Sequence, residues 1–187
     1  MNSSAMQNPI PETGATERLI LRLAHGDLAA MTPLYEEAKD AVFGYALSVL
    51  KHREDAEDVT HDCFVSVYRT APSYQPLGKP MAWIITIARN LCRMKLRDRK
   101  KYADLPDGEW QTDIEDTSRR DPDDAIVLRA CMEQLSDEER EILVLHTVSG
   151  LKHREIAELF GMPLGTVLSK YRRTLAKMNE YLTKGTK

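Results

Sequence analysis

Residues 156–167 read IAELFGMPLGTV, and this stretch decides the fold of the C-terminal part of the chain. Ala157, Gly161 and Val167 are spaced by four and then six residues. A small residue in a first helix lets a second helix approach it, and a glycine permits the tight turn between them. An apolar residue in the second helix then fixes the angle at which the two helices cross. The spacing therefore predicts a helix-turn-helix whose second helix begins near Leu164.

The second helix of this motif is expected to cover 164–183 and to expose a row of hydrogen-bonding and cationic side chains. These are Thr166, Ser169, Lys170, Arg172, Arg173 and Lys177. Such side chains suit base edges and phosphates, so the pattern predicts a helix that enters the major groove of DNA. An ordinary helical hairpin with a solvated basic face is the alternative that the pattern leaves open.

Apolar residues at helical spacing also flank this motif, and they predict an all-α fold. Further helices are expected at 17–24, 27–51, 54–69, 81–101, 122–135, 137–149 and 153–160. The sequence contains no alternation of apolar and polar residues long enough to predict a β-strand. Ser136 and Glu139 form a capping-box pattern at the start of one of these helices. Pro33 predicts either a kink or a helix that starts after Thr32.

Composition divides the chain into four segments. We expect a disordered tail at 1–16, a helical domain at 17–102, a flexible acidic linker at 103–121 and a second helical domain at 122–187. The linker is predicted because residues 103–125 hold nine acids against two arginines and lack apolar periodicity.

The formal net charge of −3 conceals a sorting of charge along the chain. Residues 89–101 carry seven cations and one acid, a spacing that suits phosphate neutralisation along one helix. Tyr74 and Trp83 precede this basic stripe, which favours binding of strand-separated DNA. Residues 54–62 are rich in acid instead. They could dock on a basic protein surface, or they could be a solvated helix end.

Several function classes are excluded by what the sequence lacks. Apolar runs long enough to span a bilayer and a secretory signal are both missing, so a cytoplasmic protein is expected. Cys63, Cys92 and Cys131 are odd in number and form no Cys-x-x-Cys pair, which indicates buried thiols. The five histidines are scattered, and a glycine-rich phosphate loop is missing. We therefore expect no catalytic activity, no metal, no cofactor and no small-molecule substrate.

Taken in chain order, these segments resemble the extracytoplasmic-function (group 4) sigma factors of the sigma-70 family. The matching motifs are 55–64 (DAEDVTHDCF), 81–90 (MAWIITIARN), 135–143 (LSDEEREIL) and 156–167. The resemblance covers about 17–102 and 122–183. It implies a sigma2-like bundle, a sigma4-like helix-turn-helix domain and a protein that directs core RNA polymerase to promoters.

The resemblance also implies roles for individual residues. The polymerase β′ clamp would be contacted by Asp55, Asp58, His61 and Asp62. The promoter −10 element would be read by Tyr74, Arg89, Asn90, Arg93 and Arg97. The −35 element would be read by Thr166, Ser169, Lys170, Arg172, Arg173 and Lys177. The second domain would also meet the β flap, and an anti-sigma factor is expected as a regulator.

This chain departs from the family at a few positions. His61 replaces the usual glutamine, and His153 replaces a usual tyrosine. A helix-turn-helix regulator that binds duplex DNA without polymerase is the alternative function. It shares the C-terminal pattern but leaves residues 17–102 unexplained.

Overall fold

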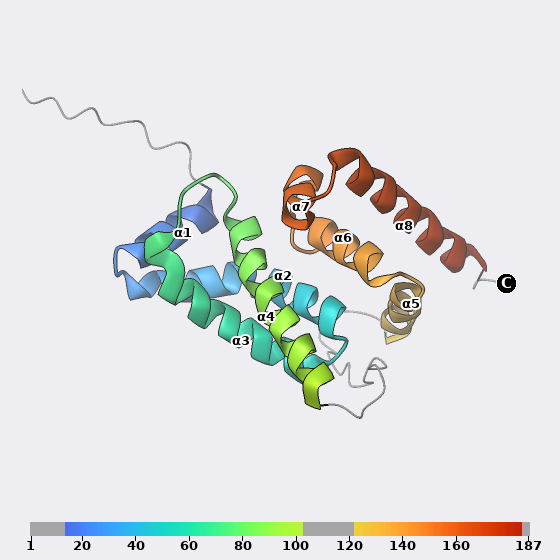
Figure 1. Ribbon diagram of the computed structural model, residues 1–187, viewed down its shortest axis with the longest axis horizontal. Helices are drawn as coiled ribbons and strands as arrows, with labels where there is room; N and C mark the ends of the chain where they lie inside the picture. The colour runs from blue at the N-terminus through green and yellow to red at the C-terminus, as the bar shows by residue number, and fades with distance from the viewer. Residues whose placement is uncertain (1–13, 103–121, 185–187) are drawn as a thin grey trace, which may run out of the picture.

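The computed structural model describes residues 14–102 and 122–184, which form eight α-helices and two short 3₁₀ helices (Figure 1). The first half contains α1 (Ala15–Ala24), η1 (Leu28–Ala30), α2 (Met31–Leu50), α3 (Arg53–Thr70), η2 (Ala71–Ser73) and α4 (Pro80–Tyr102). The second half contains α5 (Pro122–Glu133), α6 (Asp137–Thr147), α7 (His153–Phe160) and α8 (Leu164–Lys184). The prediction of an all-α fold is confirmed.

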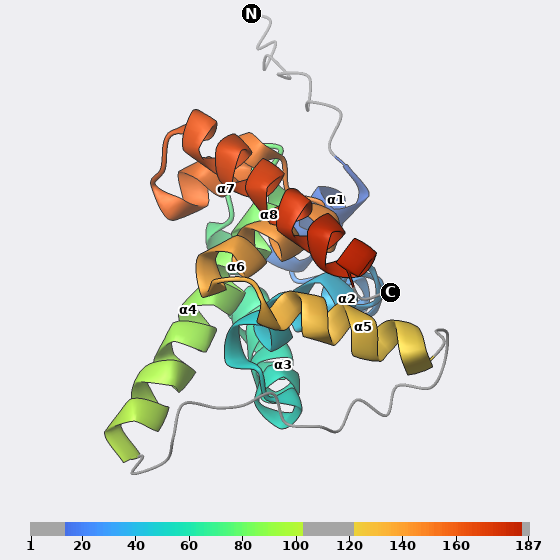
Figure 2. The ribbon, with the colours of Figure 1, turned by 90° about the vertical axis from the view of Figure 1, so that its right-hand side faces the viewer.

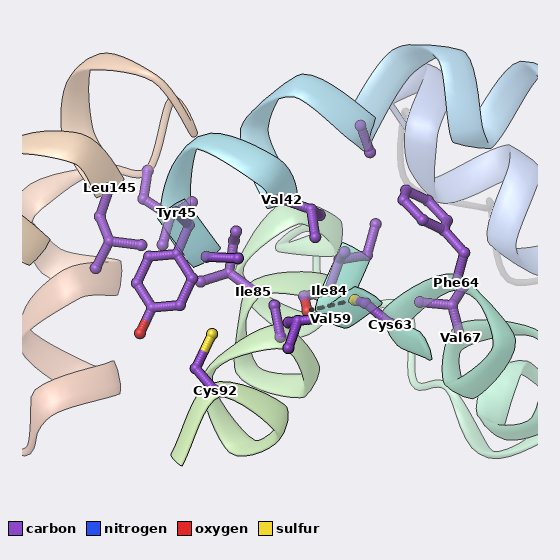
Figure 3. Close-up of a cluster of buried hydrophobic side chains, with 14 of the residues drawn as sticks. Val42, Tyr45, Val59, Cys63, Phe64, Val67, Ile84, Ile85, Cys92 and Leu145 are labelled. Carbon is purple, nitrogen blue, oxygen red and sulfur yellow. Dashed lines mark hydrogen bonds between the residues drawn. The ribbon is translucent and has the colours of Figure 1, made fainter. Parts of the chain in front are cut away.

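Helices α2, α3 and α4 pack around an apolar core (Figure 3). Val42 of α2, Val67 of α3 and Ile84 and Ile85 of α4 are all fully buried. Burial of one such side chain stabilises the fold by about 2 kcal/mol. The core therefore fixes the relative positions of the three helices that carry the predicted polymerase and −10 residues.

The three cysteines are buried thiols, as the sequence predicts. Cys63 and Cys92 lie in the core of the first half (Figure 3), and Cys131 is buried on α5. Burial raises the pKa of the Cys63 and Cys92 thiols to about 12. Because the thiolate is the reactive form, these two side chains act as small apolar groups at neutral pH.

The helix ends follow local capping rules. The Asp27 carboxylate accepts from the Ala29 N–H at 3.1 Å, which starts η1. The predicted capping box is confirmed, because Ser136 Oγ accepts from the Glu139 N–H and the Glu139 carboxylate accepts from the Ser136 N–H. Gly161 ends α7 with a φ of +64°, a left-handed conformation that glycine adopts without strain.

The predicted boundary between the tail and the first helix needs correction. Helix α1 begins at Ala15, so the prediction of a disordered tail is wrong for Ala15 and Thr16. The Thr16 hydroxyl donates to the Glu37 carboxylate, a tertiary contact that local sequence does not reveal. The predicted tail up to residue 13 and the predicted linker at 103–121 lie outside the described residues.

Pro33 does not mark the start of α2. The helix begins at Met31, so Pro33 is its third residue. In a first turn the missing N–H interrupts no hydrogen bond within the helix. The expectation of a start after Thr32 is therefore wrong by two residues. The expected span from residue 27 is also wrong at this end, because Leu28–Ala30 form η1 and α2 begins only at Met31.

Helices α6, α7 and α8 form the predicted helix-turn-helix domain, with α5 packed against α8. Ala157 and Val167 are buried, and the Met162 N–H donates to the Ala157 carbonyl at 2.9 Å in the turn. Ile142 and Ile156 complete the core beneath the turn, both fully buried. The spacing that predicted this motif thus corresponds to the packed face of α7 and α8.

The two halves of the chain also pack against each other (Figures 1 and 2). Helix α6 lies against α2, and α7 lies against α4. Their buried apolar side chains belong to one continuous cluster that extends from Ile20 to Val167. Figure 3 shows Tyr45 of α2 beside Leu145 of α6. The sequence predicted two domains joined by a linker and did not predict this shared core.

Candidate polymerase and nucleic-acid interfaces

Helix α8 carries all the predicted −35 residues within its first four turns. Ser169, Arg172, Arg173 and Lys177 are exposed, and Thr166 and Lys170 are half-buried. Two of the cations are held by α6: Lys170 pairs with Glu138, and Lys177 Nζ lies 2.6 Å from Glu139 Oε1. These ion pairs fix α8 against α6, and they leave the exposed guanidinium groups of Arg172 and Arg173 to face solvent.

A cluster of three aromatic rings lies beneath α8. The rings of His146 and His153 are 4.0 Å apart between centroids, and each lies within 4.9 Å of the Tyr171 ring. Nδ1 of His146 lies 2.9 Å from the Leu151 carbonyl. His153 Nε2 is buried without a hydrogen-bond partner among the described residues. Burial lowers the pKa of His153 below its usual 6.5, and the neighbouring His146 lowers it further.

This cluster predicts a loss of stability in mild acid. The folded chain holds His153 neutral, so below about pH 6.5 the unfolded chain binds more protons and the free energy of unfolding falls. We expect His153→Tyr, which restores the residue usual in the resembled family, to flatten this dependence. Urea unfolding of both proteins at pH 7.5 and pH 5.5 measures how the free energy of unfolding depends on pH. Equal pH dependence of the two proteins would contradict the assignment.

Helix α3 presents a face on which Asp58, His61 and Asp62 are all exposed. Their spacing of three and four residues places them on one side of the helix. We call these three residues the acidic face. Asp55 was predicted to belong to the same site, but its side chain is only 15% exposed. Its carboxylate pairs with Lys95 at 3.0 Å and with Arg99, so two cations of α4 neutralise it.

The cations of the predicted basic stripe on α4 point in two directions. Lys95 and Arg99 turn toward α3, where Lys95 also pairs with Asp58 at 2.9 Å. Arg93 and Arg97, four residues apart, are exposed. Among the stripe cations whose side chains the structure describes, Arg93 and Arg97 can be reached by a nucleic acid without breaking an ion pair.

Tyr74 begins the loop at 74–79, and the structure buries it. Its hydroxyl donates to Glu17 Oε1 at 2.7 Å, and the Gly78 N–H donates to the same oxygen at 2.9 Å. The Tyr74 ring lies 4.8 Å from the Trp83 ring. Burial and the hydrogen bond to Glu17 raise the pKa of Tyr74. The predicted −10 residue Tyr74 is thus positioned by α1.

Sequence reasoning missed Glu17, which is 2% exposed and organises this loop. The sequence does carry a signal for the burial of Glu17. Glu17 precedes Ile20 by three residues and so shares the apolar face of α1. An acid at such a position is buried on folding and requires hydrogen-bond donors, which Tyr74 and Gly78 supply.

Arg89, the central −10 residue of the prediction, lies between the two halves of the chain. Its side chain is 13% exposed, and its Nη1 donates to the Leu159 carbonyl of α7 at 2.6 Å. The guanidinium group stacks over the Phe160 ring at 4.4 Å. Its Nε lies 4.0 Å from Glu141, which in turn accepts from the Tyr45 hydroxyl at 3.0 Å. Burial raises the pKa of Glu141.

A cleft of about 540 Å³ opens beside Arg89. One wall is formed by the 74–79 loop and by Trp83 and Asn90 of α4, and the other by Glu155 and Glu158 of α7. Asn90 is exposed at its rim. The structure therefore brings Tyr74, Arg89 and Asn90 to one place, whereas Arg93 and Arg97 lie further along α4.

Within 14–102 and 122–184, no group of histidine, cysteine and acidic side chains could hold a metal ion. Over the same residues, no helix combines the length and the apolar character that crossing a membrane requires.

Family models match both halves of the chain. The model described as Sigma-70 region 2 matches residues 34–102, and the one described as Sigma-70, region 4 matches residues 125–178. The first spans the acidic face and α4, and the second spans the helix-turn-helix. Both matches fall inside the predicted domains at 17–102 and 122–187.

Curated relatives show the same family along most of the chain. The ECF RNA polymerase sigma factor SigE of Mycolicibacterium smegmatis is 32% identical over 86% of this chain and 66% of its own length. The ECF RNA polymerase sigma factor SigK of Mycobacterium sp. (strain KMS) is 28% identical over 82% of this chain and 83% of its own length.

Two solved structures share the fold. One is CnrH in complex with the cytosolic domain of CnrY, with a TM-score of 0.65 and 22% identity over 89% of this chain and 96% of that one. The other is the sigma factor RpoE in complex with the anti-sigma factor NepR from Bartonella quintana. It has a TM-score of 0.67 and 22% identity over 81% of this chain and 96% of that one.

The two family matches occur in the order that the sequence motifs predicted, and the named relatives extend across both of them. The chain belongs to the extracytoplasmic-function group of the sigma-70 family, the transcription initiation factors that bind core RNA polymerase and promoter DNA.

Proposed function

We propose that this chain joins core RNA polymerase in the cytoplasm and directs it to a set of promoters, without catalysing a reaction itself. The observation that carries the proposal is the division of surfaces between the two matched regions. Region 2 contains the exposed acidic face together with the loop and cations beside α4. Region 4 contains a helix-turn-helix with exposed arginines on its second helix.

The polymerase clamp would dock on the acidic face of α3. Asp58, His61 and Asp62 are exposed and lie on one side of the helix. A carboxylate-rich face suits a basic partner surface, because complementary charge speeds encounter and fixes orientation. Asp55 is held by α4 instead, so its contribution would be to position α3 against α4.

Promoter DNA would be shared between the two halves. The −10 strand would meet the 74–79 loop, Arg89, Asn90, Arg93 and Arg97. The −35 duplex would receive α8, with Arg172 and Arg173 on its exposed side and Thr166 and Ser169 near its start. Mixed cations and hydroxyls are the groups that read base edges and phosphates together.

A regulatory partner is also proposed. The RpoE structure that shares this fold is a complex with an anti-sigma factor. An anti-sigma factor for this chain would act by covering the acidic face, the cleft beside Arg89, or both.

Reconstitution tests the proposed function. Core polymerase is supplied with the purified chain and genomic DNA, and the 5′ ends of the transcripts are mapped. We expect starts at a limited set of promoters that core enzyme alone does not use. A chain that binds duplex DNA tightly but leaves the pattern of starts unchanged would be a regulator independent of polymerase, and the proposal would be wrong.

The recognition helix predicts a specific salt dependence. With Lys170→Met and Arg173→Met together, binding to a −35 duplex should weaken, and the slope of log K against log salt should flatten by about 0.9 per lost phosphate contact. Fluorescence anisotropy from 50 to 300 mM salt measures the slope. Arg69→Met on α3 is the control, because it removes an exposed cation from the other half. An unchanged slope would remove these two residues from the interface.

A further inference from the structure

The 74–79 loop, which the proposed function places against −10 DNA, has an exposed middle between two distinct ends. The middle consists of three exposed residues, Gln75, Pro76 and Leu77, which we call the arch. Tyr74 before the arch is buried, and Gly78 after it has a φ of +71°, a left-handed conformation that favours glycine. Gln75 and Leu77 line the cleft of about 540 Å³, as does Asn90 of α4. The arch and this predicted −10 residue therefore border the same space.

A single carboxylate oxygen of Glu17 joins the two ends of the arch. Glu17 Oε1 accepts from the Tyr74 hydroxyl at 2.7 Å and from the Gly78 N–H at 2.9 Å. The two donors are four residues apart along the chain, so their shared acceptor fixes the span of the arch. Glu17 is 2% exposed, and hydrogen bonds to a charged acceptor are stronger away from water. The arch is thus held by a buried group that lies outside the loop.

Helix α1 gives Glu17 a fixed position relative to α4. Ile20 and Leu23 of α1 are buried in the core, and the Thr16 hydroxyl donates to Glu37 of α2. The helix packs against both η2 and α4, and Figure 1 shows the loop before α4 passing beside it. Because α4 carries the other predicted −10 residues, Glu17 sets the place of the arch relative to them.

We infer that Glu17 is a positioning residue for −10 recognition, which holds the arch in the conformation that discriminates between bases and does not itself contact DNA. This inference rests on the proposed function. A loop fixed in its binding conformation loses less conformational entropy when it binds, and its groups stay in the geometry that selects a ligand. A released arch could repack around several bases, as adaptable surfaces do. Loss of Glu17 should therefore broaden the choice of −10 sequence.

Three variants separate the acceptor oxygen from the bulk of the side chain. Glu17→Leu removes the acceptor and suits the apolar face of α1. Glu17→Gln keeps an acceptor oxygen with two lone pairs, so it should retain both hydrogen bonds. Tyr74→Phe removes one donor and keeps the ring beside Trp83. The matched control is Thr16→Val, which removes the hydrogen bond from α1 to Glu37 and leaves the two bonds of the arch in place.

The readout is transcription by reconstituted holoenzyme from one mapped promoter, in which each base of the −10 and −35 elements is replaced in turn. Glu17→Leu should lower the preference for the best base by at least about fivefold at one or two −10 positions, since one mismatch usually costs that factor or more. Tyr74→Phe should weaken the preference at the same positions. Gln75→Ala and Leu77→Ala should identify these positions independently, because they change the arch itself.

Two internal comparisons distinguish positioning from a general loss of stability. The −35 preferences of every variant should stay within about twofold of the unmodified chain, because α8 is distant from the loop in sequence and makes no contact with it that a hydrogen bond records. Glu17→Gln and Thr16→Val should keep their −10 preferences within about twofold as well. Urea unfolding of each variant gives its stability for comparison.

Unchanged −10 preferences in Glu17→Leu and Tyr74→Phe would overturn the inference, even if both transcribe less. So would an equal change in Thr16→Val, because any loosening of α1 would then suffice. If Glu17→Leu does not fold, Tyr74→Phe decides the question alone. In these cases the unmodified chain still starts transcription at its promoters, and the proposed function survives. If the unmodified chain directs no specific starts, the proposed function is wrong and the inference falls with it.

Discussion

Replacing both Asp58 and Asp62 by lysine should reduce the affinity of the chain for core RNA polymerase by about 100-fold or more. Both carboxylates are exposed on the acidic face of α3. If that face docks on a basic surface, the change converts two attractive contacts into repulsive ones, which costs several kcal/mol at an interface. A loss of about 2.7 kcal/mol corresponds to 100-fold. Co-purification and fluorescence titration with core enzyme measure the loss.

A matched control is available on α2. Glu36→Lys and Asp40→Lys change the net charge by the same amount at exposed positions on a different helix. They should leave polymerase binding within about twofold, because distant surface charges are screened at physiological salt. Both double variants should also remain folded by circular dichroism. Equal losses of binding in the two proteins would show that net charge, and not the acidic face, governs association.

Arg140→Met should unfold much of the helix-turn-helix domain under conditions in which the unmodified chain is stable. Arg140 is 2% exposed, and its guanidinium donates to the Met132 carbonyl at 3.1 Å and to the Leu135 carbonyl at 2.8 Å. It also pairs with Asp137 at 2.8 Å. Methionine keeps an apolar stem but leaves two carbonyls at the end of α5 without this donor. A buried unsatisfied group costs about 1–3 kcal/mol, so the two carbonyls together cost about 2–6 kcal/mol.

That loss is comparable to a large part of the stability of a small domain. We expect a lower urea midpoint for the C-terminal helices and a loss of −35 duplex binding at 37 °C. The control is Arg154→Met, which changes an exposed arginine of α7 and should alter stability by less than about 0.5 kcal/mol. Retention of the full urea midpoint by Arg140→Met would show that α5 is held to α6 by other contacts.

Local rules in the sequence determined the helices and the helix-turn-helix. Hydrophobic spacing predicted seven of the eight α-helices to within two residues at their ends, and α2, which was expected from residue 27, begins four residues later at Met31. The spacing also located the turn at Gly161. The capping box at Ser136 and Glu139 could be predicted from the sequence for the same reason. Helical periodicity and capping depend on residues three or four positions apart, so a single sequence carries them in full.

The tertiary structure alone decided which charged groups face solvent. Asp55 and Arg99 are 44 residues apart, Arg89 and Leu159 are 70 apart, and each pair meets only because helices pack. The sequence therefore predicted a continuous basic stripe, whereas the fold turns Lys95 and Arg99 inward. The burial of Arg89 depends on where α7 comes to rest against α4. Contacts between distant helices depend on the shape of the whole core, and spacing along one helix does not encode them.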